Sequence, residues 1–457
     1  MIIGLLFAQE KSMFVKNIQK SRKNVAKLLA TVPDAPTGDL RHLVEMVRRK
    51  SAAIKKIVAT HPTPFYVFDR ATTEEAIKKF TIPFKKHIKG IKFYFAVKTN
   101  YHPLLLKTVV DHGMGLDVSS ARELLLGVSS GAQELLFSGP GKNEQELMVF
   151  LKHRKRSTLI IDSFDELDRI GQITNTQKIM VRAGVRFFSS FHGEWSKFGI
   201  PLDDIKSFWQ RAQRYPFLNL EGLQFHISLN RTPKRYVDII KELSVYLKSN
   251  CSAIMRKQIR FIDFGGGYYP DNVEGFYPWA ERYPWMLSGG YLMKVADEGV
   301  GEHTQFGDKY FITRADAPEV FAKSIAGAIR THLEPLVNSQ YYCEPGRIIA
   351  HSAMHIVTSV VDRKPGMVIT DGGNNLVGWE AGNQFYYPIV NITHPSKKEI
   401  PIRVYGSLCN PKDLWGYYSY SKKFDQGDVL VIPFQGAYRY TLAQNFIRSV
   451  PPVYPLE

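Results

Sequence analysis

Short apolar runs alternate with amphipathic segments along most of this chain. Eight such runs lie near residues 92, 114, 134, 158, 179, 222, 261 and 341. Segments with the apolar spacing of helices separate them, as in HPLLLKTVVDH (102–112). The run Phe93–Val97 contains no polar residue, which is typical of a strand buried on both faces of a parallel sheet. Eight strands alternating with helices predict a (β/α)8 barrel, with an open doubly wound sheet as the alternative.

The pattern changes at about residue 345. Runs such as MHIVTSVVDRK (354–364) and DVLVIPF (428–434) are strand-like, and no helical pattern separates them. We therefore expect the barrel to occupy residues 76–345 and an all-β domain to occupy residues 346–457.

Two further segments stand apart from these domains. A first strand within residues 61–75, at PTPFYVFD, is expected to associate with the β domain. The stretch 265–315 is rich in Gly, Pro and aromatic residues and interrupts the barrel pattern. A loop of that length inside a compact domain is usually functional.

Composition narrows the class of protein. The chain has 457 residues, of which 44% are hydrophobic, and this suits a large buried core. Its net charge of +17 is concentrated partly in residues 1–60, which we interpret as a basic extension. No nucleic-acid-binding signature accompanies that charge, so neither nucleic acid nor a membrane is an expected partner. No apolar run reaches the roughly 18 residues of a membrane span.

Cysteine usage points to a reducing compartment. Cys251, Cys343 and Cys409 are far apart and form no CxxC pair, which argues against a disulfide framework and a cysteine-based metal site. The opening MIIGLLFAQ lacks a basic segment before it and is a poor signal peptide. We therefore expect a cytoplasmic protein with no structural metal.

The residues that close the predicted strands carry the candidate chemistry, because a barrel places its active site at the carboxyl ends of its strands. Lys98 closes the first strand, Asp117 the second, Arg182 the fifth, His226 the sixth, Gly265, Gly266 and Gly267 the seventh, and Glu344 the eighth. Each has an ordinary structural interpretation, such as a surface lysine or a core histidine. Their joint occurrence at strand ends favours a common site.

These residue types suit a pyridoxal phosphate site. A lysine can form a Schiff base with a carbonyl cofactor. Successive glycines let backbone N–H groups approach a phosphate. A carboxylate beside a pyridine nitrogen keeps that nitrogen protonated and sustains an electron sink.

The chain also resembles the fold-type III pyridoxal-phosphate decarboxylases, the family of diaminopimelate, ornithine and arginine decarboxylases. The segments that carry the resemblance are FAVKTN, GLDVSSARE, SKFGI, QFHIS, DFGGGY, CEPGR, TDGGNN, SLCNPKD and GAYRY. The resemblance implies a barrel plus a β domain, pyridoxal 5'-phosphate as cofactor, and a head-to-tail homodimer with active sites at its interface.

The resemblance also implies roles for the cofactor-binding residues. Lys98 would bind the cofactor covalently, His226 would stack on its ring, and Glu344 would hold the pyridine nitrogen. The phosphate would be bound by Gly265 to Gly267, Tyr438 and the hydroxyl of Ser228. Asp117 and Arg182, which close the second and fifth strands, are also expected to bind the cofactor.

For the reaction itself, the resemblance implies that Cys409, reaching in from the partner subunit, protonates the α-carbon after carbon dioxide leaves. A small buried hydrophobe is the alternative interpretation of this cysteine. Arg347 would meet the cofactor phosphate or a substrate carboxylate, and Tyr438 is also expected to contact substrate. Asn410 and Asp413 follow the cysteine and are expected to contact substrate.

The chain departs from the family pattern where substrate is selected. The family's CES-type motif reads Cys409-Asn410-Pro411 here, and its arginine-bearing RPALY-like segment reads VGWEAGNQFYY (377–387) with no arginine. The phosphate-binding HIGS turn reads His226-Ile227-Ser228-Leu229. These changes argue for an altered substrate, with a conjugated, citrate-linked amino acid as one alternative. An amino-acid racemase and a non-catalytic relative remain further alternatives.

Overall fold

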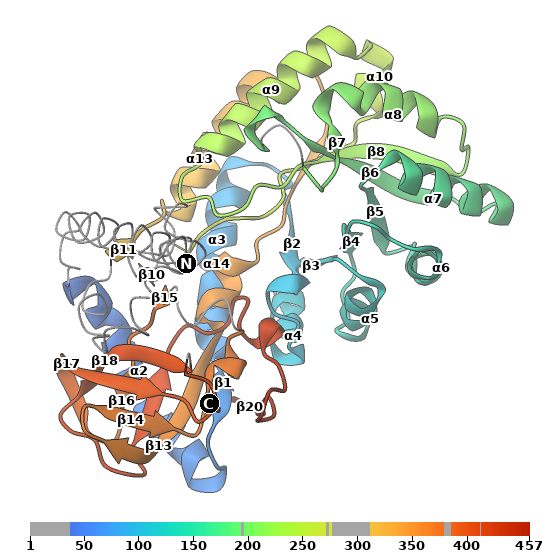
Figure 1. Ribbon diagram of the computed structural model, residues 1–457. Coiled ribbons are helices and arrows are strands. Elements are labelled where there is room, and N and C mark those ends of the chain that lie inside the picture. The colour runs from blue at the N-terminus through green and yellow to red at the C-terminus, as the bar shows by residue number, and fades with distance from the viewer. Residues whose placement is uncertain (1–36, 193–195, 271–273, 277–310, 379–384, 412) are drawn as a thin grey trace, which may run out of the picture.

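The structure is a computed structural model that describes residues 37–192, 196–270, 274–276, 311–378, 385–411 and 413–457 (Figure 1). The basic run 11–29, and much of the stretches 265–315 and 377–387, lie outside these residues. The described part divides into a barrel and a β-rich domain, which Figure 1 shows at opposite sides of the view.

Eight parallel strands form the barrel. They are β2 (Lys92–Ala96), β3 (Gly115–Val118), β4 (Leu135–Phe137), β5 (Ser157–Ile161), β6 (Val181–Phe188), β8 (Leu218–Gln224), β9 (Phe261–Asp263) and β12 (Gln340–Cys343). The ring closes because β12 pairs with β2 and β5 pairs with β6. The short β7 (Ile200–Pro201) joins β6 at its end. All eight predicted strands are present, and the closed barrel is confirmed over the open sheet.

Helices follow the barrel strands and cover the outside of the ring. They are α4 (Pro103–Asp111), α5 (Ala121–Ser129), α6 (Glu144–His153), α7 (Phe164–Gln177), α8 (Ile205–Ala212), α9 (Lys234–Asn250), α10 (Ala253–Gln258), α13 (Pro318–Ala328) and α14 (Arg347–Ala350). Side-chain caps begin several of them: Ser120, Asn143 and Ser163 each accept a hydrogen bond from a first-turn backbone N–H. Such caps stabilise a helix by about 0.5–2 kcal/mol and fix where it starts.

An aromatic layer fills the barrel interior on the side away from the carboxyl ends of the strands. The rings of Phe261 and Tyr342 stack with centroids 4.8 Å apart, and Tyr94 lies 5.2 Å from Tyr342. These rings pack with aliphatic side chains from β4 and β5 in one buried cluster. Room for Phe261 exists because β6 and β8 carry glycine opposite it, at Gly184 and Gly222. Charged and polar groups lie beyond this layer, at the carboxyl ends of the strands.

We expect Gly222→Ala to destabilise the protein by about 1–3 kcal/mol, the usual cost of overpacking a filled core. A Cβ at this position would lie 2.0 Å from the Phe261 ring. The midpoint of urea unfolding measures the change. Gly327→Ala in α13 is the matched control, since no atom lies within 4 Å of its added methyl group. Equal midpoints for the two variants would contradict a tightly filled barrel.

The β domain is an eight-stranded sheet in the order β14-β17-β18-β16-β19-β13-β1-β20. Its strands are β1 (Phe65–Phe68), β13 (Met354–Lys364), β14 (Met367–Thr370), β16 (Val390–Asn391), β17 (Pro395–Tyr405), β18 (Leu414–Ser421), β19 (Val429–Ile432) and β20 (Val453–Pro455). The predicted C-terminal β domain is confirmed. Strand β1 precedes the barrel in sequence and pairs with β13 and β20. The chain therefore enters the barrel from the β domain, through α3 (Arg70–His87).

A small three-stranded sheet lies beside these domains. It contains β10 (Glu274–Phe276), β11 (Phe311–Thr313) and β15 (Phe385–Tyr386). It joins the segment between β9 and α13 to the segment that follows β14.

The described part of the N-terminal extension is a helix that packs on the β domain. Helix α2 (Thr37–Thr60) buries Val44, Val47 and Ile54 in a cluster with strand residues of that domain. Its Lys50 pairs with Asp69, the residue that caps α3. Residues 41–60 are therefore part of the folded unit. None of the helices in the described ranges is long and apolar enough to cross a bilayer.

Candidate active site

Lys98 stands at the carboxyl end of β2, on the single turn η1 (Val97–Thr99) that follows the strand. Its side chain is 34% exposed, and its Nζ lies 3.8 Å from Oδ2 of the fully buried Asp117 on β3. Burial lowers the pKa of Lys98, but the charges of Asp117 and Glu344 outweigh that effect and raise it above its usual value. The Ser138 hydroxyl donates to the other oxygen of Asp117. A lysine amine therefore lies at the mouth of the barrel beside an anchored carboxylate.

Glu344 follows β12 and is wholly buried. Its Oε1 accepts a hydrogen bond of 2.8 Å from Nε2 of Gln224, the last residue of β8. Its Oε2 has no hydrogen-bond partner, although it is shielded from solvent. Burial alone would raise the pKa of Glu344, but neighbouring His226 and Lys98 lower it to about 2. An ionised carboxylate oxygen without a donor is a place for a ligand N–H.

His226 lies beside this carboxylate. Its Nδ1 accepts a hydrogen bond of 3.1 Å from the Gly266 backbone N–H, so the neutral ring carries its proton on Nε2. Nδ1 also lies 3.5 Å from Glu344 Oε2. Burial, followed by the charge of Lys98, lowers the pKa of His226 to about 4. The imidazole is therefore a neutral flat surface at neutral pH.

The glycine run after β9 makes close backbone contacts with the end of β8. A Cβ on Gly267, at φ +89°, would lie 1.8 Å from the Ile227 carbonyl oxygen. A Cβ on Gly266 would lie 2.3 Å from the Glu344 carbonyl oxygen. The Asn230 N–H donates to the Gly267 carbonyl over 2.8 Å. Only glycine fits these positions, and the backbone itself forms the surface at this edge of the site.

Arg347 and Tyr438 meet at the same edge. The Arg347 guanidinium lies 5.0 Å from the centre of the Tyr438 ring and 5.1 Å from that of Tyr269. Tyr438 has φ +58°, and its N–H donates to the Thr99 carbonyl over 2.9 Å. This bond joins the GAYRY segment of the β domain to the turn that carries Lys98. The structure thus brings together Lys98, Asp117, His226, Gly265, Gly266, Gly267, Glu344, Arg347 and Tyr438.

Cys409 lies on an exposed loop of the β domain, between β17 and β18. Asp413 shapes this loop: its two carboxylate oxygens accept backbone N–H groups of Asn374 at 2.6 Å and Leu408 at 2.7 Å. Asp413 is 1% exposed. The expectation that it contacts substrate is therefore replaced by a structural role, because its acceptors face the backbone. Asn410 is half-buried beside the cysteine.

The expectation that Arg182 binds the cofactor is not supported by its position. Strand β6 begins at Val181 and continues to Phe188, so Arg182 lies at the amino end of the ring. It pairs with Glu221 over 2.7 Å and is 55% exposed. Residues two apart share one face of a strand, which places Arg186 at the functional end. Arg186 is buried there and donates to Gln224.

Ser228 stands on an exposed turn after β8, followed by Leu229 at φ +59°. Its contact with a phosphate stays a prediction.

Sequence reasoning missed the buried polar residues within the strands. Arg186, Gln224 and Asp263 all line the upper barrel, and Asp263 Oδ1 accepts the Gly265 N–H over 2.9 Å. The signal was present: a polar residue in an apolar strand, two or four positions from an inward residue, points into the barrel. A search limited to the residues that close the strands did not find these polar residues.

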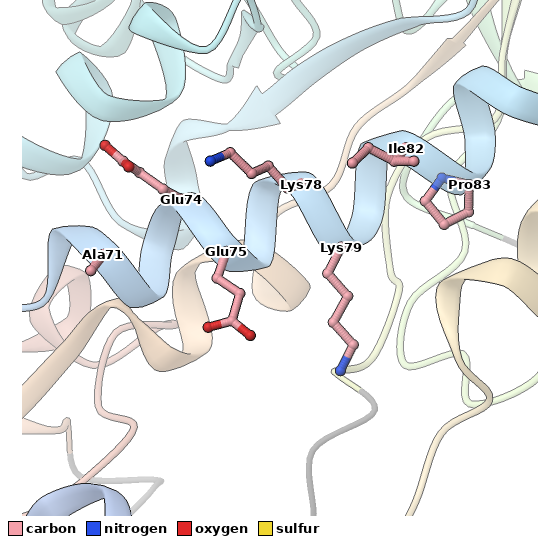
Figure 2. A pocket seen from close by; sticks show the side chains of 7 residues that line it. All are labelled: Ala71, Glu74, Glu75, Lys78, Lys79, Ile82 and Pro83. Carbon is pink, nitrogen blue, oxygen red and sulfur yellow. The ribbon is translucent and has the colours of Figure 1, made fainter. Parts of the chain in front are cut away.

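A hollow on the outer face of α3 contains none of these residues (Figure 2). It is lined by Ala71, Glu74, Glu75, Lys78, Lys79, Ile82 and Pro83. The polar cluster at the strand ends is therefore the candidate active site, and it lies apart from this hollow.

A lysine at the end of a barrel strand, a buried carboxylate with one oxygen unpartnered and a glycine-lined edge are the features of a pyridoxal-phosphate enzyme built on a (β/α)8 barrel. Residues 74–280 match the family described as the pyridoxal-binding domain of pyridoxal-dependent decarboxylases. The barrel part of the chain therefore matches this family, and the protein is a pyridoxal-phosphate-dependent decarboxylase, a carboxy-lyase.

The named relatives are decarboxylases, but they are named for different substrates. The chain is 24% identical over 416 residues to a 2-[(L-alanin-3-ylcarbamoyl)methyl]-2-hydroxybutanedioate decarboxylase of Staphylococcus aureus, covering 86% of this chain and 93% of that protein. It is 22% identical over 419 residues to the diaminopimelate decarboxylase of Aquifex aeolicus, covering 87% of both.

Solved structures show the same fold. Diaminopimelate decarboxylase from Helicobacter pylori, complexed with L-lysine, superposes with a TM-score of 0.69 at 22% identity, over 88% of this chain and 94% of that one. Lysine/ornithine decarboxylase from Vibrio vulnificus, complexed with putrescine, gives 0.68 at 20% identity, over 89% and 98%.

The residues present fit the family's cofactor. The unpartnered Glu344 Oε2 suits a protonated ring nitrogen. The Arg347 guanidinium, which lies 5.0 Å from the Tyr438 ring, is a cation that suits a phosphate. Lys98 supplies the amine that a carbonyl cofactor needs. Pyridoxal phosphate is therefore the group that this cluster of side chains is built to hold.

Proposed function

We propose that this decarboxylase acts on an amino acid whose side chain ends in a conjugated, anionic group instead of a free amine. The observation that carries the proposal is the position of Asp413. Both of its oxygens accept backbone N–H groups and its side chain is 1% exposed, so this carboxylate holds the Cys409 loop and is shielded from a substrate ammonium.

A free distal ammonium needs a carboxylate partner to be bound tightly, since a buried charge without one is strongly disfavoured. Next to Cys409 the chain has the neutral Asn410, which can hydrogen-bond an amide or carboxylate. Arg347, at the edge of the site, has the fork of donors that matches carboxylates. These donors favour a conjugate with amide and carboxylate groups.

The chain's residues divide the work of the reaction. Bound pyridoxal phosphate supplies an electron sink for the electron pair released when the Cα–carboxylate bond breaks. The negative charge of Glu344 would face the ring nitrogen of the cofactor. The neutral imidazole of His226 would stack on the cofactor ring. Lys98 would hold the cofactor through Nζ and would carry a proton there once a substrate is bound. Cys409 Sγ would deliver a proton to Cα after carbon dioxide leaves.

The relatives support this proposal and provide one competitor. The Staphylococcus aureus relative is named for a substrate in which an alanine unit is joined through an amide to a hydroxybutanedioate, which keeps two carboxylates. A compound of that class is our first candidate. Meso-diaminopimelate is the second, because several relatives are named for it and its distal end also carries a carboxylate.

We further propose that the protein works as a cytoplasmic head-to-tail homodimer. In support, Cys409 is exposed on a loop that Asp413 holds in place, which suits a side chain offered to a neighbouring subunit. The described residues include no helix that could span a membrane.

The test is carbon dioxide release from a substrate panel. The panel contains the amide-linked hydroxybutanedioate conjugate, meso-diaminopimelate, ornithine, lysine and arginine, with Lys98→Ala protein as the blank. We expect kcat/KM for the conjugate to exceed that for each free diamino acid by about 10²-fold or more, the discrimination typical of sites with matched polar groups. Faster turnover of any free diamino acid would overturn the conjugate proposal.

A further inference from the structure

A chain of three buried polar side chains crosses the upper barrel and ends at Glu344. Arg186 Nε donates to Gln224 Oε1 over 2.6 Å, and Gln224 Nε2 donates to Glu344 Oε1 over 2.8 Å. Gln224 and Glu344 are fully buried, and Arg186 is 6% exposed. The three residues come from β6, β8 and the end of β12, which are neighbours through β9 in the ring.

The amide of Gln224 connects a cation to an anion. An amide can accept on its oxygen and donate from its nitrogen at once, whereas a carboxylate or an ammonium group in the same place could do only one. With Arg186 on its oxygen, the Gln224 amide has one orientation, and its N–H is fixed on Glu344 Oε1. The carboxylate then keeps Oε2, the oxygen without a donor, as its remaining acceptor.

Arg186 is itself anchored. Its Nη1 donates to Asp162 Oδ1 over 3.3 Å, and its guanidinium lies 5.7 Å from the centre of the Phe198 ring. A planar guanidinium with donors on two sides holds both partners in fixed geometry. Arg186 thus has contacts in place before any ligand enters.

The charges around Glu344 make such anchoring necessary. Two other buried carboxylates, Asp117 and Asp263, line the same end of the barrel, and burial raises the pKa of both above the usual range. The cations that offset them are Lys98 and Arg186, since His226 is neutral. Lys98 must exchange its contacts during the reaction, so Arg186 is the cation that stays in place.

We propose that Gln224 and Arg186 are positioning residues for this decarboxylase: they hold Glu344 in one rotamer and in its ionised form, with Oε2 presented to the ring nitrogen of the cofactor. Neither residue touches the reacting atoms. Their effect passes through Glu344. The proposal rests on the pyridoxal-phosphate site and is independent of which amino acid is the substrate.

The experiment uses Gln224→Met in the holoenzyme, because methionine keeps the length of glutamine and cannot donate the hydrogen bond. The visible absorbance of the bound cofactor is titrated against pH, which reports protonation of the imine that Lys98 would form with it, without any substrate; the pKa of that imine depends on whether the ring nitrogen is held protonated. We expect the apparent pKa of that transition to shift by about one unit, equivalent to a tenfold loss of stabilisation. We expect kcat to fall by a similar factor while KM changes less than twofold.

A double-mutant comparison separates positioning from general damage. Glu344→Gln should give a larger spectral shift than Gln224→Met. The double variant should be no worse than Glu344→Gln alone, since residues acting through one group are not additive. Additive losses would overturn the proposal, as would a wild-type absorbance titration for Gln224→Met.

Arg186→Gln is the second variant, and Arg182→Gln is its matched control. Both arginines lie on β6 and both pair with a carboxylate, but Arg182 is at the opposite end of the barrel. We expect the absorbance shift only for Arg186→Gln. Should loss of the Asp162 partner unfold that variant, Gln224→Met still decides the question. A wild-type protein that binds cofactor but decarboxylates nothing in the panel would refute the proposed substrate and leave this spectral test intact.

Discussion

Replacing Lys98 with alanine is expected to lower kcat/KM by about 10²–10⁴-fold, the range for loss of a positioned proton-transfer group. The side chain is the amine at the carboxyl end of β2, and its Nζ lies 3.8 Å from the buried Asp117. We expect that without it the cofactor would lose its covalent attachment to the protein. Carbon dioxide release measures the activity, and the visible absorbance of bound cofactor measures the attachment.

Lys107→Ala is the control for this experiment. Lys107 lies on α4, the helix that follows Lys98. It is 62% exposed and pairs with Asp111. Its loss should change neither activity nor absorbance, since an exposed pair contributes only about 0–1 kcal/mol. The role of Lys98 would be refuted by a Lys98→Ala protein that keeps the absorbance of bound cofactor and most of its turnover.

Mixing two inactive variants is expected to restore about a quarter of wild-type activity, if each site takes Lys98 from one subunit and Cys409 from the other. One chain carries Lys98→Ala and the other carries Cys409→Ala. Random assembly makes half of the dimers mixed, and one of the two sites in a mixed dimer has both side chains. The exposed position of Cys409 motivates the experiment.

Co-expressed chains with different affinity tags allow the mixed dimer to be purified and assayed. Each variant alone sets the background. No gain over that background in a confirmed mixed dimer would show that each subunit supplies its own cysteine, or that Cys409 is not needed. A monomeric protein in sedimentation would contradict the dimer directly.

Much of the fold could be predicted from the sequence, because local patterns report it. Each barrel strand is a short apolar run followed by a helical pattern, and burial on both faces forces that composition. The β domain was recognisable from strand-like runs without helices. The association of β1 with the β domain was expected, but its pairing with β13, nearly 290 positions away, is specified only by the sheet register.

The site was predictable where residues end strands. Lys98, Glu344 and the glycine run lie at positions that any parallel barrel brings to one edge, so their meeting follows from strand order. It was not predictable where a residue's role depends on its partners. In the sequence, Asp413 is a polar residue near a candidate catalytic cysteine. In the structure, its two oxygens accept hydrogen bonds from backbone N–H groups. Similarly, Arg182 and Arg186 are both arginines of one strand, and strand length decides which lies in the site.

The sequence by itself determined the barrel, the β domain and the set of residues at the strand ends, since these depend on periodicity and on chain order. Only the tertiary structure decided which polar groups are paired and which are left without a partner. Gln224 is bound to Arg186 and Glu344 because β6, β8 and β12 converge, and one oxygen of Glu344 is left without a donor for the same reason. Hydrogen bonds and charge effects depend on distances of a few ångströms between segments far apart in sequence, and no local pattern encodes those distances.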